Sequence, residues 1–234
     1  MKFENIYKET EESMRSTLLS FWAKGNLTMQ KALNEMFERE PLLAEPVFQC
    51  SFGWKKCEDA SWKDSLNKDV IQKLEIGTTY IPYEHQGKSW KALKDNKSIV
   101  VTSGTGSGKT ECFMYPIISD LYEQRKNNET KAIEAIFLYP LNALMYDQKD
   151  RLKKYCKKTG LHFAVYNGKT DEYKRQNALI VDNEVMARNG IREAATRPEI
   201  LLTNPSMLEY ILVREADRGM LSQGKLRWIV IDEA

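Results

Sequence analysis

The residues best suited to chemistry form a glycine-rich run between a β-branched segment, 99–101, and an expected helix over 111–121. Glycines let a backbone turn with positive φ and gather its N–H groups at a helix N-terminus, where phosphate binds. In such a cradle Lys109 would contact the β- and γ-phosphates of a nucleoside triphosphate, and the Thr110 hydroxyl would ligate Mg²⁺. The run comprises Ser103, Gly104, Thr105, Gly106, Ser107, Gly108, Lys109 and Thr110.

This run departs from the strict phosphate-loop pattern at its first position, where Ser103 stands in place of glycine. A small residue is sterically sufficient to open the turn. The alternative is a glycine-rich surface turn between a strand and a helix. Because strand, loop, Gly-Lys-Thr and helix follow in the order that the motif requires, the sequence favours the phosphate loop.

Composition limits the class of protein. The chain has 234 residues, of which 42% are hydrophobic, enough for one well-buried domain and a smaller appendage. Its 35 Lys and Arg against 33 Asp and Glu do not by themselves indicate a nucleic-acid partner. The four cysteines are scattered, without the spacing of a zinc site or a disulfide framework. Without an apolar run of membrane-spanning length or a signal-peptide core at its polar start, the chain is expected to be cytoplasmic.

The order of the expected elements predicts two domains. Residues 1–77 form a mainly helical, aromatic-rich extension with a break near 24–26, and no site is assigned to it. Residues 78–234 alternate helices with apolar runs that predict strands. Such alternation indicates an α/β fold, in which a parallel sheet is sandwiched by helices and ligands bind at the carboxyl ends of the strands. The expected strands cover 99–101, 133–139, 161–166, 200–203 and 226–231.

Two further features could complete a nucleotide site. Asp232 and Glu233 directly follow the last expected strand. An adjacent Asp-Glu pair is usually a solvated pair on the surface, but its position after a strand favours a role in the site. Gln86 lies just upstream of the phosphate loop, and its amide could accept a hydrogen bond from adenine N6 and donate one to N7. That pairing would select ATP over GTP. A glutamine near a helix start is otherwise most often a solvated residue.

With these motifs in order, residues 78–234 resemble the first RecA-like lobe of superfamily 2 helicases of the DEAD/DEAH class. The resemblance implies that Gln86 reads adenine, that Asp232 holds Mg²⁺ through water, and that Glu233 polarises the attacking water. The sequence motifs at 139–144, 203–210 and 231–234 most resemble those of large bacterial DNA helicases with a DUF1998 region. Several members of that group act in DNA repair or anti-phage defence.

The same resemblance implies a surface for nucleic acid. Its candidate residues follow three strand ends, and one of them, Asn142, replaces an arginine common in the family. Backbone N–H groups and small polar side chains at such an edge can contact phosphates, so binding is expected to be independent of sequence. Single-stranded DNA is favoured over RNA as the partner. The candidates are Pro140, Leu141, Asn142, Gly168, Thr203, Asn204 and Pro205.

The resemblance further implies a second RecA-like lobe, which this chain does not include. That lobe supplies arginine fingers that can be worth ~10³ or more in rate, so the chain alone is expected to turn over little ATP. Two alternatives remain open. One is a short regulatory module that binds ATP or nucleic acid without hydrolysis, and the other is a double-strand translocase subunit of a restriction or defence complex.

Overall fold

The computed structural model describes residues 3–44, 53–58, 60–127, 131–222 and 224–232. The chain divides into two compact units, Met1–Gly53 and Trp54–Ala234. Residues 54–77, assigned from the sequence to the extension, are therefore part of the second unit, and Trp62 and Val70 lie in its buried core. No helix in the described part of the chain combines the length and the apolar composition that a membrane span requires.

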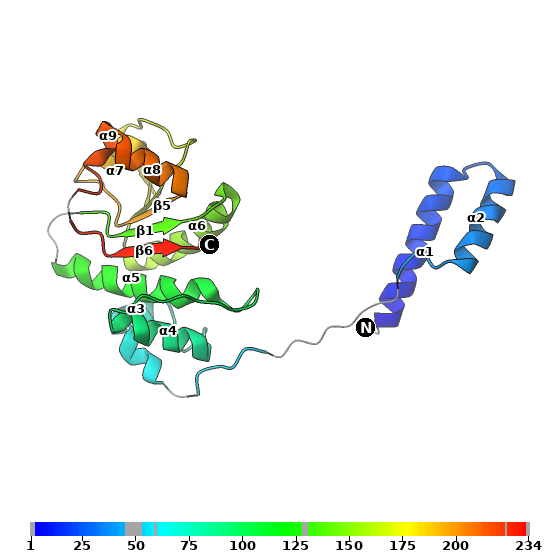
Figure 1. Ribbon diagram of the computed structural model, residues 1–234, viewed down its shortest axis with the longest axis horizontal. Helices are drawn as coiled ribbons and strands as arrows, with labels where there is room; N and C mark the ends of the chain where they lie inside the picture. Colours follow the sequence, from blue (N-terminus) through cyan, green and yellow to red (C-terminus); the bar gives the residue numbers. More distant parts are fainter. Residues whose placement is uncertain (1–2, 45–52, 59, 128–130, 223, 233–234) are drawn as a thin grey trace. The chain divides into compact units, whose positions relative to one another are not determined.

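The first unit contains a pair of helices, α1 (Phe3–Trp22) and α2 (Leu27–Arg39), as the sequence predicts. The expected break lies between them, where the Asn26 side chain accepts a hydrogen bond from the Met29 amide at 3.1 Å and caps α2. Arg15 of α1 donates to the Phe37 carbonyl of α2 at 2.9 Å. The helical extension is thus confirmed over these residues (Figure 1).

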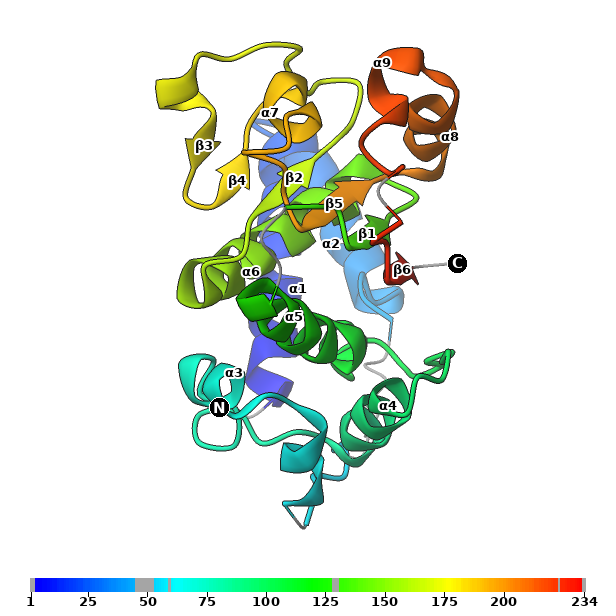
Figure 2. The same ribbon diagram turned by 90° about the vertical axis from the view of Figure 1, so that its left-hand side faces the viewer.

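The second unit is built on a six-stranded sheet with the order β3-β4-β2-β5-β1-β6. Neighbouring strands are parallel except β3, which runs antiparallel to β4, so the sheet is mixed rather than wholly parallel. Figure 2 shows β3 and β4 at one edge and β6 at the other. The strands are β1 (Ala135–Leu138), β2 (Phe163–Val165), β3 (Ile180–Val181), β4 (Glu184–Val185), β5 (Ile200–Thr203) and β6 (Trp228–Ile231).

Helices cover both faces of this sheet (Figure 1), because alternate strand residues point to opposite sides. On one side Phe137, Phe163 and Leu202 join a cluster with residues of α5 and α6, and on the other Ile136 and Leu201 meet α7 and α8. The helices are α3 (Lys68–Lys73), α4 (Glu84–Lys94), α5 (Lys109–Asn127), α6 (Asn142–Thr159), α7 (Arg188–Arg192), α8 (Pro205–Val213) and α9 (Glu215–Arg218). Two short 3₁₀ turns, Ser61–Ser65 and Gln176–Ala178, complete the elements.

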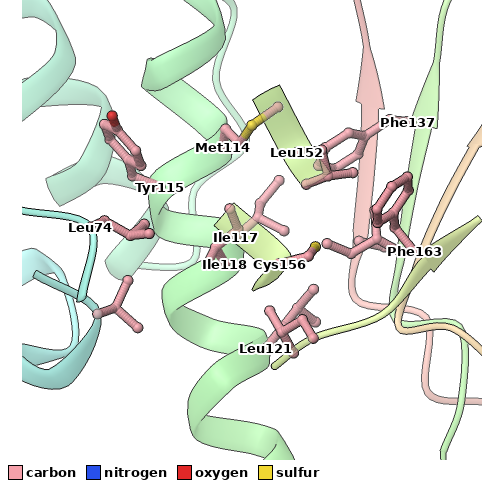
Figure 3. Close-up of a cluster of buried hydrophobic side chains, with 14 of the residues drawn as sticks. Leu74, Met114, Tyr115, Ile117, Ile118, Leu121, Phe137, Leu152, Cys156 and Phe163 are labelled. Carbon is pink, nitrogen blue, oxygen red and sulfur yellow. The ribbon is translucent and has the colours of Figure 1, made fainter. Parts of the chain in front are cut away.

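Helix α5 lies at the centre of the larger cluster. Figure 3 shows Ile117 and Leu121 of α5 beside Leu152 and Cys156 of α6, with Phe163 of β2 next to them. All five side chains are almost completely buried. Because α5 begins at Lys109, the core that fixes this helix also fixes the end of the glycine-rich run.

The strand predicted for 99–101 is wrong: the structure assigns this segment to no strand, and the Val100 side chain is 91% exposed. A strand exists through the hydrogen bonds it exchanges with a neighbour, and β6, the last strand in the sheet order, pairs with β1. Residues of 98–103 and of β6 line a groove of about 1110 Å³ instead. The β-branched composition of 99–101 favours a strand, but it cannot show whether a neighbouring strand is present to pair with.

We predict that Leu152→Ala destabilises the chain by about 2–5 kcal/mol, because it opens a cavity in the cluster between α6 and the sheet. Urea unfolding followed by tryptophan fluorescence measures this change. Leu212→Ala on α8 is the matched control: its side chain is 58% exposed, so its effect should stay within about 0.5 kcal/mol. Equal losses in the two variants would contradict a core centred on α5 and α6.

Candidate functional site

The phosphate loop is fixed by polar side chains of α4. His85 Nε2 lies 3.0 Å from the Ser107 carbonyl oxygen, and Gln86 Nε2 donates to the Gly108 carbonyl at 2.9 Å. Trp90 Nε1 donates to the carbonyl of Glu111, in the first turn of α5, at 2.9 Å. Three side chains of one helix thus hold carbonyls of the loop and of the helix that follows it.

Gln86 is fully buried at the centre of this contact. Its Oε1 accepts from the Tyr83 amide at 2.8 Å and from the Tyr80 hydroxyl at 2.5 Å, so both acceptor positions are used. Gly108 has a φ of +75°, and a Cβ there would collide with the Gln86 amide. Glycine at 108 therefore meets two needs, a left-handed backbone and close packing against α4.

The interior of the loop offers a cation to an anionic ligand. Lys109 Nζ donates to the Ser103 carbonyl at 3.0 Å and lies 3.5 Å from the Gly104 carbonyl, while no carboxylate in the described part of the chain pairs with it. Gly106 has a φ of +75° and open space where a Cβ would be. An ammonium bonded only to neutral carbonyls is complementary to a phosphate, so these residues fit the group that the motif implies.

Asp232 is the acidic residue that the structure brings to this loop. Its amide donates to the Leu138 carbonyl at 3.1 Å, which fixes it just beyond the carboxyl end of β6. Asp232, Ser103 and Lys109 line the same groove. Burial, together with the nearby Asp232 carboxylate, raises the pKa of the Tyr139 hydroxyl, which therefore stays protonated. Glu233, the predicted catalytic carboxylate, lies outside the described residues.

The strand-end candidates lie along one edge of the sheet. Pro140, Leu141 and Asn142 are exposed after β1, and the Asn204 side-chain amide donates to Asn142 Oδ1 at 3.4 Å. Asn204 also caps α8, since its Oδ1 accepts from the Met207 amide at 2.8 Å. Pro205 is the first residue of α8, as expected for proline at a helix start. The ends of β1 and β5 are thus joined by polar contacts.

The end of β2 continues this edge. Asn167, directly before Gly168, donates from its side chain to the Tyr146 hydroxyl of α6 at 3.1 Å. Gly168 has open space around the position of a Cβ. Thr203 is different from the other candidates because it is fully buried, and its hydroxyl donates to the Tyr166 carbonyl at 2.7 Å. It ties the ends of β5 and β2 together rather than facing solvent.

Sequence reasoning missed one aromatic residue at the loop. Trp54 lies 3.6 Å from the position that a Cβ of Gly104 would occupy, and its ring meets the His85 ring edge-on at 5.6 Å. A β-bridge between Lys56 and Tyr83 brings this segment to α4. The position of Trp54 could not be predicted from the sequence. It depends on the single β-bridge between Lys56 and Tyr83, and one bridge leaves no repeating pattern of residues.

These features define a class of protein. A phosphate loop leads into a helix packed on a sheet whose central strands are parallel. An acidic residue directly after β6 lines the same groove as the loop. This is the arrangement of a P-loop nucleotide-binding lobe of the RecA type.

The chain belongs to the DEAD/DEAH box helicase family, whose profile matches residues 83–234. It is 26% identical to the Druantia protein DruE of Escherichia coli (strain UMEA 4076-1), over 70% of this chain and 14% of DruE. It is 28% identical to the uncharacterized ATP-dependent helicase YprA of Bacillus subtilis (strain 168), over 75% of this chain and 20% of YprA. The resemblance to the first RecA-like lobe of this family is thereby confirmed.

Among solved structures, the chain is similar to the DUF1998 helicase MrfA bound to DNA and AMPPNP, with a TM-score of 0.55 and 24% identity. The match covers 76% of this chain and 22% of MrfA, and at that identity it supports the fold. The chain thus covers 14% of DruE, 20% of YprA and 22% of MrfA, about a fifth of the length of each relative at most.

Proposed function

We propose that this chain is the ATP-binding lobe of an ATP-dependent nucleic-acid helicase or translocase. The observation that carries the proposal is the groove in which Lys109, at the end of the phosphate loop, and Asp232, at the end of β6, come together. Hydrolysis of a triphosphate needs a cation on the phosphates and a carboxylate near the metal, and elements far apart in the sequence bring the two here. Membership of the helicase family supports the same conclusion.

Each residue of the groove then has a role that follows from its position. Lys109 would exchange the Ser103 carbonyl for phosphate oxygens, and the loop amides near Gly106 would donate to the same group. Thr110 and Asp232 would hold Mg²⁺, the latter through water. When bound, Mg²⁺ neutralises charge on the phosphates. Glu233 is proposed to polarise the attacking water, on the strength of its family motif.

We predict that Lys109→Ala abolishes the weak Mg-ATP binding expected of this chain, because it removes the cation that faces the phosphates. Isothermal titration calorimetry measures the affinity. Lys154→Ala, at an exposed position on α6, is the control that removes a lysine charge elsewhere and should bind as the unchanged chain does. Unchanged affinity in Lys109→Ala would rule out the phosphate-loop assignment.

Gln86 is proposed to read the adenine base. Its Nε2 has a second hydrogen beyond the one given to the Gly108 carbonyl, and donating this hydrogen to adenine N7 would require the side chain, fully buried here, to become accessible. For Gln86 Oε1 to accept a hydrogen bond from adenine N6, the Tyr80 hydroxyl would have to give up its bond to Oε1. The Tyr83 amide could keep its own bond to the same oxygen. Guanine has O6 in place of the N6 amino group, so it offers an acceptor where Gln86 has one too.

ATP should therefore displace a fluorescent ATP analogue more effectively than GTP does, and Gln86→Ala should erase that difference. The readout is the ratio of the two affinities, because loss of the buried amide also releases the Gly108 carbonyl and weakens both nucleotides. Gln72→Ala, an exposed glutamine on α3, should retain the preference. Equal competition by GTP in the unchanged chain would remove Gln86 from base recognition.

The edge formed by the ends of β1, β5 and β2 is proposed to bind single-stranded DNA through its phosphates. Polar groups of Asn142, Asn204 and the Asn167-Gly168 turn lie along it, at strand ends where groups of this kind can contact phosphates. MrfA, a helicase of similar fold, was solved with DNA bound, which supports DNA over RNA for this chain. A second RecA-like lobe is the partner this proposal requires. A place in a repair or anti-phage complex rests on the motif resemblance.

We predict that Gly168→Leu weakens binding of a labelled oligothymidylate several-fold, because the side chain would enter the space that the strand backbone needs. The substitution should leave the fold intact, since nothing lies within 4 Å of the added Cβ. Gly219→Leu is the matched control, at another glycine with open space, directly after α9. Fluorescence anisotropy at several salt concentrations measures the affinity, which should fall as salt rises.

Equal binding by the two leucine variants would indicate that 167–168 is an ordinary turn. Thr203→Ala is expected to weaken binding indirectly, because the lost hydroxyl frees the Tyr166 carbonyl between β5 and β2.

A further inference from the structure

Beyond the motifs of the family, three arginines gather around one carboxylate near the end of β2. Glu172 is contacted by Arg192 Nη1, by Arg188 Nη1 at 3.4 Å and by Arg214 Nη1 at 3.6 Å. We call Arg188, Arg192 and Arg214 the arginine cluster. Its members come from α7 and from the residue before α9, so the fold rather than a local motif assembles it.

The cluster contains a second carboxylate whose role is structural. Asp217 is fully buried, and it accepts from Arg192 Nε at 2.6 Å and from the Tyr166 hydroxyl at 2.6 Å. Burial, together with this bond, raises the pKa of Tyr166 to about 12, so the hydroxyl remains a donor. Arg214 Nη1 also lies 3.6 Å from Asp217 Oδ2, so this buried carboxylate is a fixed part of the fold that pairs with two arginines of the cluster.

Glu172, unlike the buried Asp217, is a carboxylate that another anion could replace. Its side chain is 54% exposed, and it lies outside the helices and strands, in the stretch between β2 and β3. Three guanidinium groups face only two carboxylates, which leaves one positive charge in excess. Arg188 Nε and Arg192 Nη2 are buried without a hydrogen-bond acceptor from any described residue. The cluster thus has more donors than Glu172 can satisfy.

The position of the cluster links it to the proposed nucleic-acid edge. Arg188 Nη2 donates to the Asn167 carbonyl at 3.0 Å, directly before Gly168, and its guanidinium lies 4.8 Å from the centre of the Tyr166 ring. The residue that anchors the turn at the end of β2 is therefore also a member of the cluster. A strand following that edge would pass beside its guanidinium groups.

We propose that the arginine cluster is a binding site for a backbone phosphate of nucleic acid, and that Glu172 occupies it as an internal substitute until the strand displaces it. This inference rests on the proposed function. Guanidinium groups bind carboxylate and phosphate with the same paired N–H geometry, so one can replace the other. A phosphate brings more acceptor oxygens than a carboxylate, so it could take more of the bonds that the guanidinium groups offer. Glu172 is the exposed member of these pairs, at 54% against 12–31% for the arginines, so it is the partner that a phosphate could displace from the solvent side.

The experiment titrates the full 234-residue chain, under several salt concentrations, into a fluorescein-labelled oligothymidylate followed by anisotropy. Glu172→Gln keeps the shape of the side chain and removes its charge, so binding should tighten about five-fold and its dependence on log salt should steepen by about one. Arg188→Gln should weaken binding about ten-fold and make the salt dependence shallower by about one. The double variant should lose the gain made by Glu172→Gln.

Glu193→Gln is the matched control. Glu193 is exposed beside Arg192 at the end of α7, and no ion pair involving it occurs among the described residues. Removing its charge should leave the affinity nearly unchanged. Thermal melting checks that each variant is folded. If Glu172→Gln lowers stability, the affinity of the Arg188→Gln variant for the oligonucleotide still tests the site.

Three results would overturn the inference. If Glu172→Gln and Glu193→Gln tighten binding equally, the gain comes from the change in net charge and not from exposing a phosphate site at the arginine cluster. If the unchanged chain binds DNA and Glu172→Gln binds it no better, Glu172 is not a competitor, although the proposed function stands. If the unchanged chain does not bind DNA even at low salt, the nucleic-acid part of the proposed function fails, and this inference fails with it.

Discussion

The structure depends on one buried carboxamide. The side chain of Gln86 is enclosed between α4 and the phosphate loop, where it satisfies the Gly108 carbonyl and the Tyr83 amide. Leaving either group buried without a partner would cost about 1–3 kcal/mol, so α4 and the loop cannot separate cheaply. His85 and Trp90 repeat the constraint on either side. The curvature of the glycine-rich run is therefore imposed by a neighbouring helix as much as by its own glycines.

From this contact the constraint passes into the hydrophobic core. α5 begins at Lys109 and continues as a buried helix packed between α4, α6 and the sheet. A rigid helix fixes the direction of its first turn, so packing at Ile117 and Leu121 determines where the Lys109 ammonium can reach. On the opposite face of the sheet, the Asp217 network fastens α9 to α7 and to Tyr166 at the end of β2. The two proposed binding surfaces are thus supported by separate sets of contacts on the two faces of the sheet.

Much of this organisation could be predicted from the sequence. The strand 200–203 was predicted with its observed bounds because this short apolar run is followed directly by Asn204 and Pro205, which begin α8. The segment 99–101 could not be judged in the same way, because its composition says nothing about whether a neighbour is present. β3 and β4 are two residues each, too short to show alternation. The arginine cluster was invisible because loops of irregular length separate its members, and the burial of Gln86 was hidden because one polar residue in a helix gives no periodic signal.

Among the described residues β6 is an edge strand of the sheet, which has a consequence for the physical behaviour of the purified chain. β6 pairs with β1 on one side, and Ile229 and Ile231 on its surface are 60% and 64% exposed. Natural edge strands usually carry lysine, proline or a bulge that prevents another strand from adding to them, and the four residues of β6 contain neither of those residue types. An apolar, β-branched edge of this kind is a template for intermolecular pairing. Association through this strand would join two chains, so its extent would rise with protein concentration.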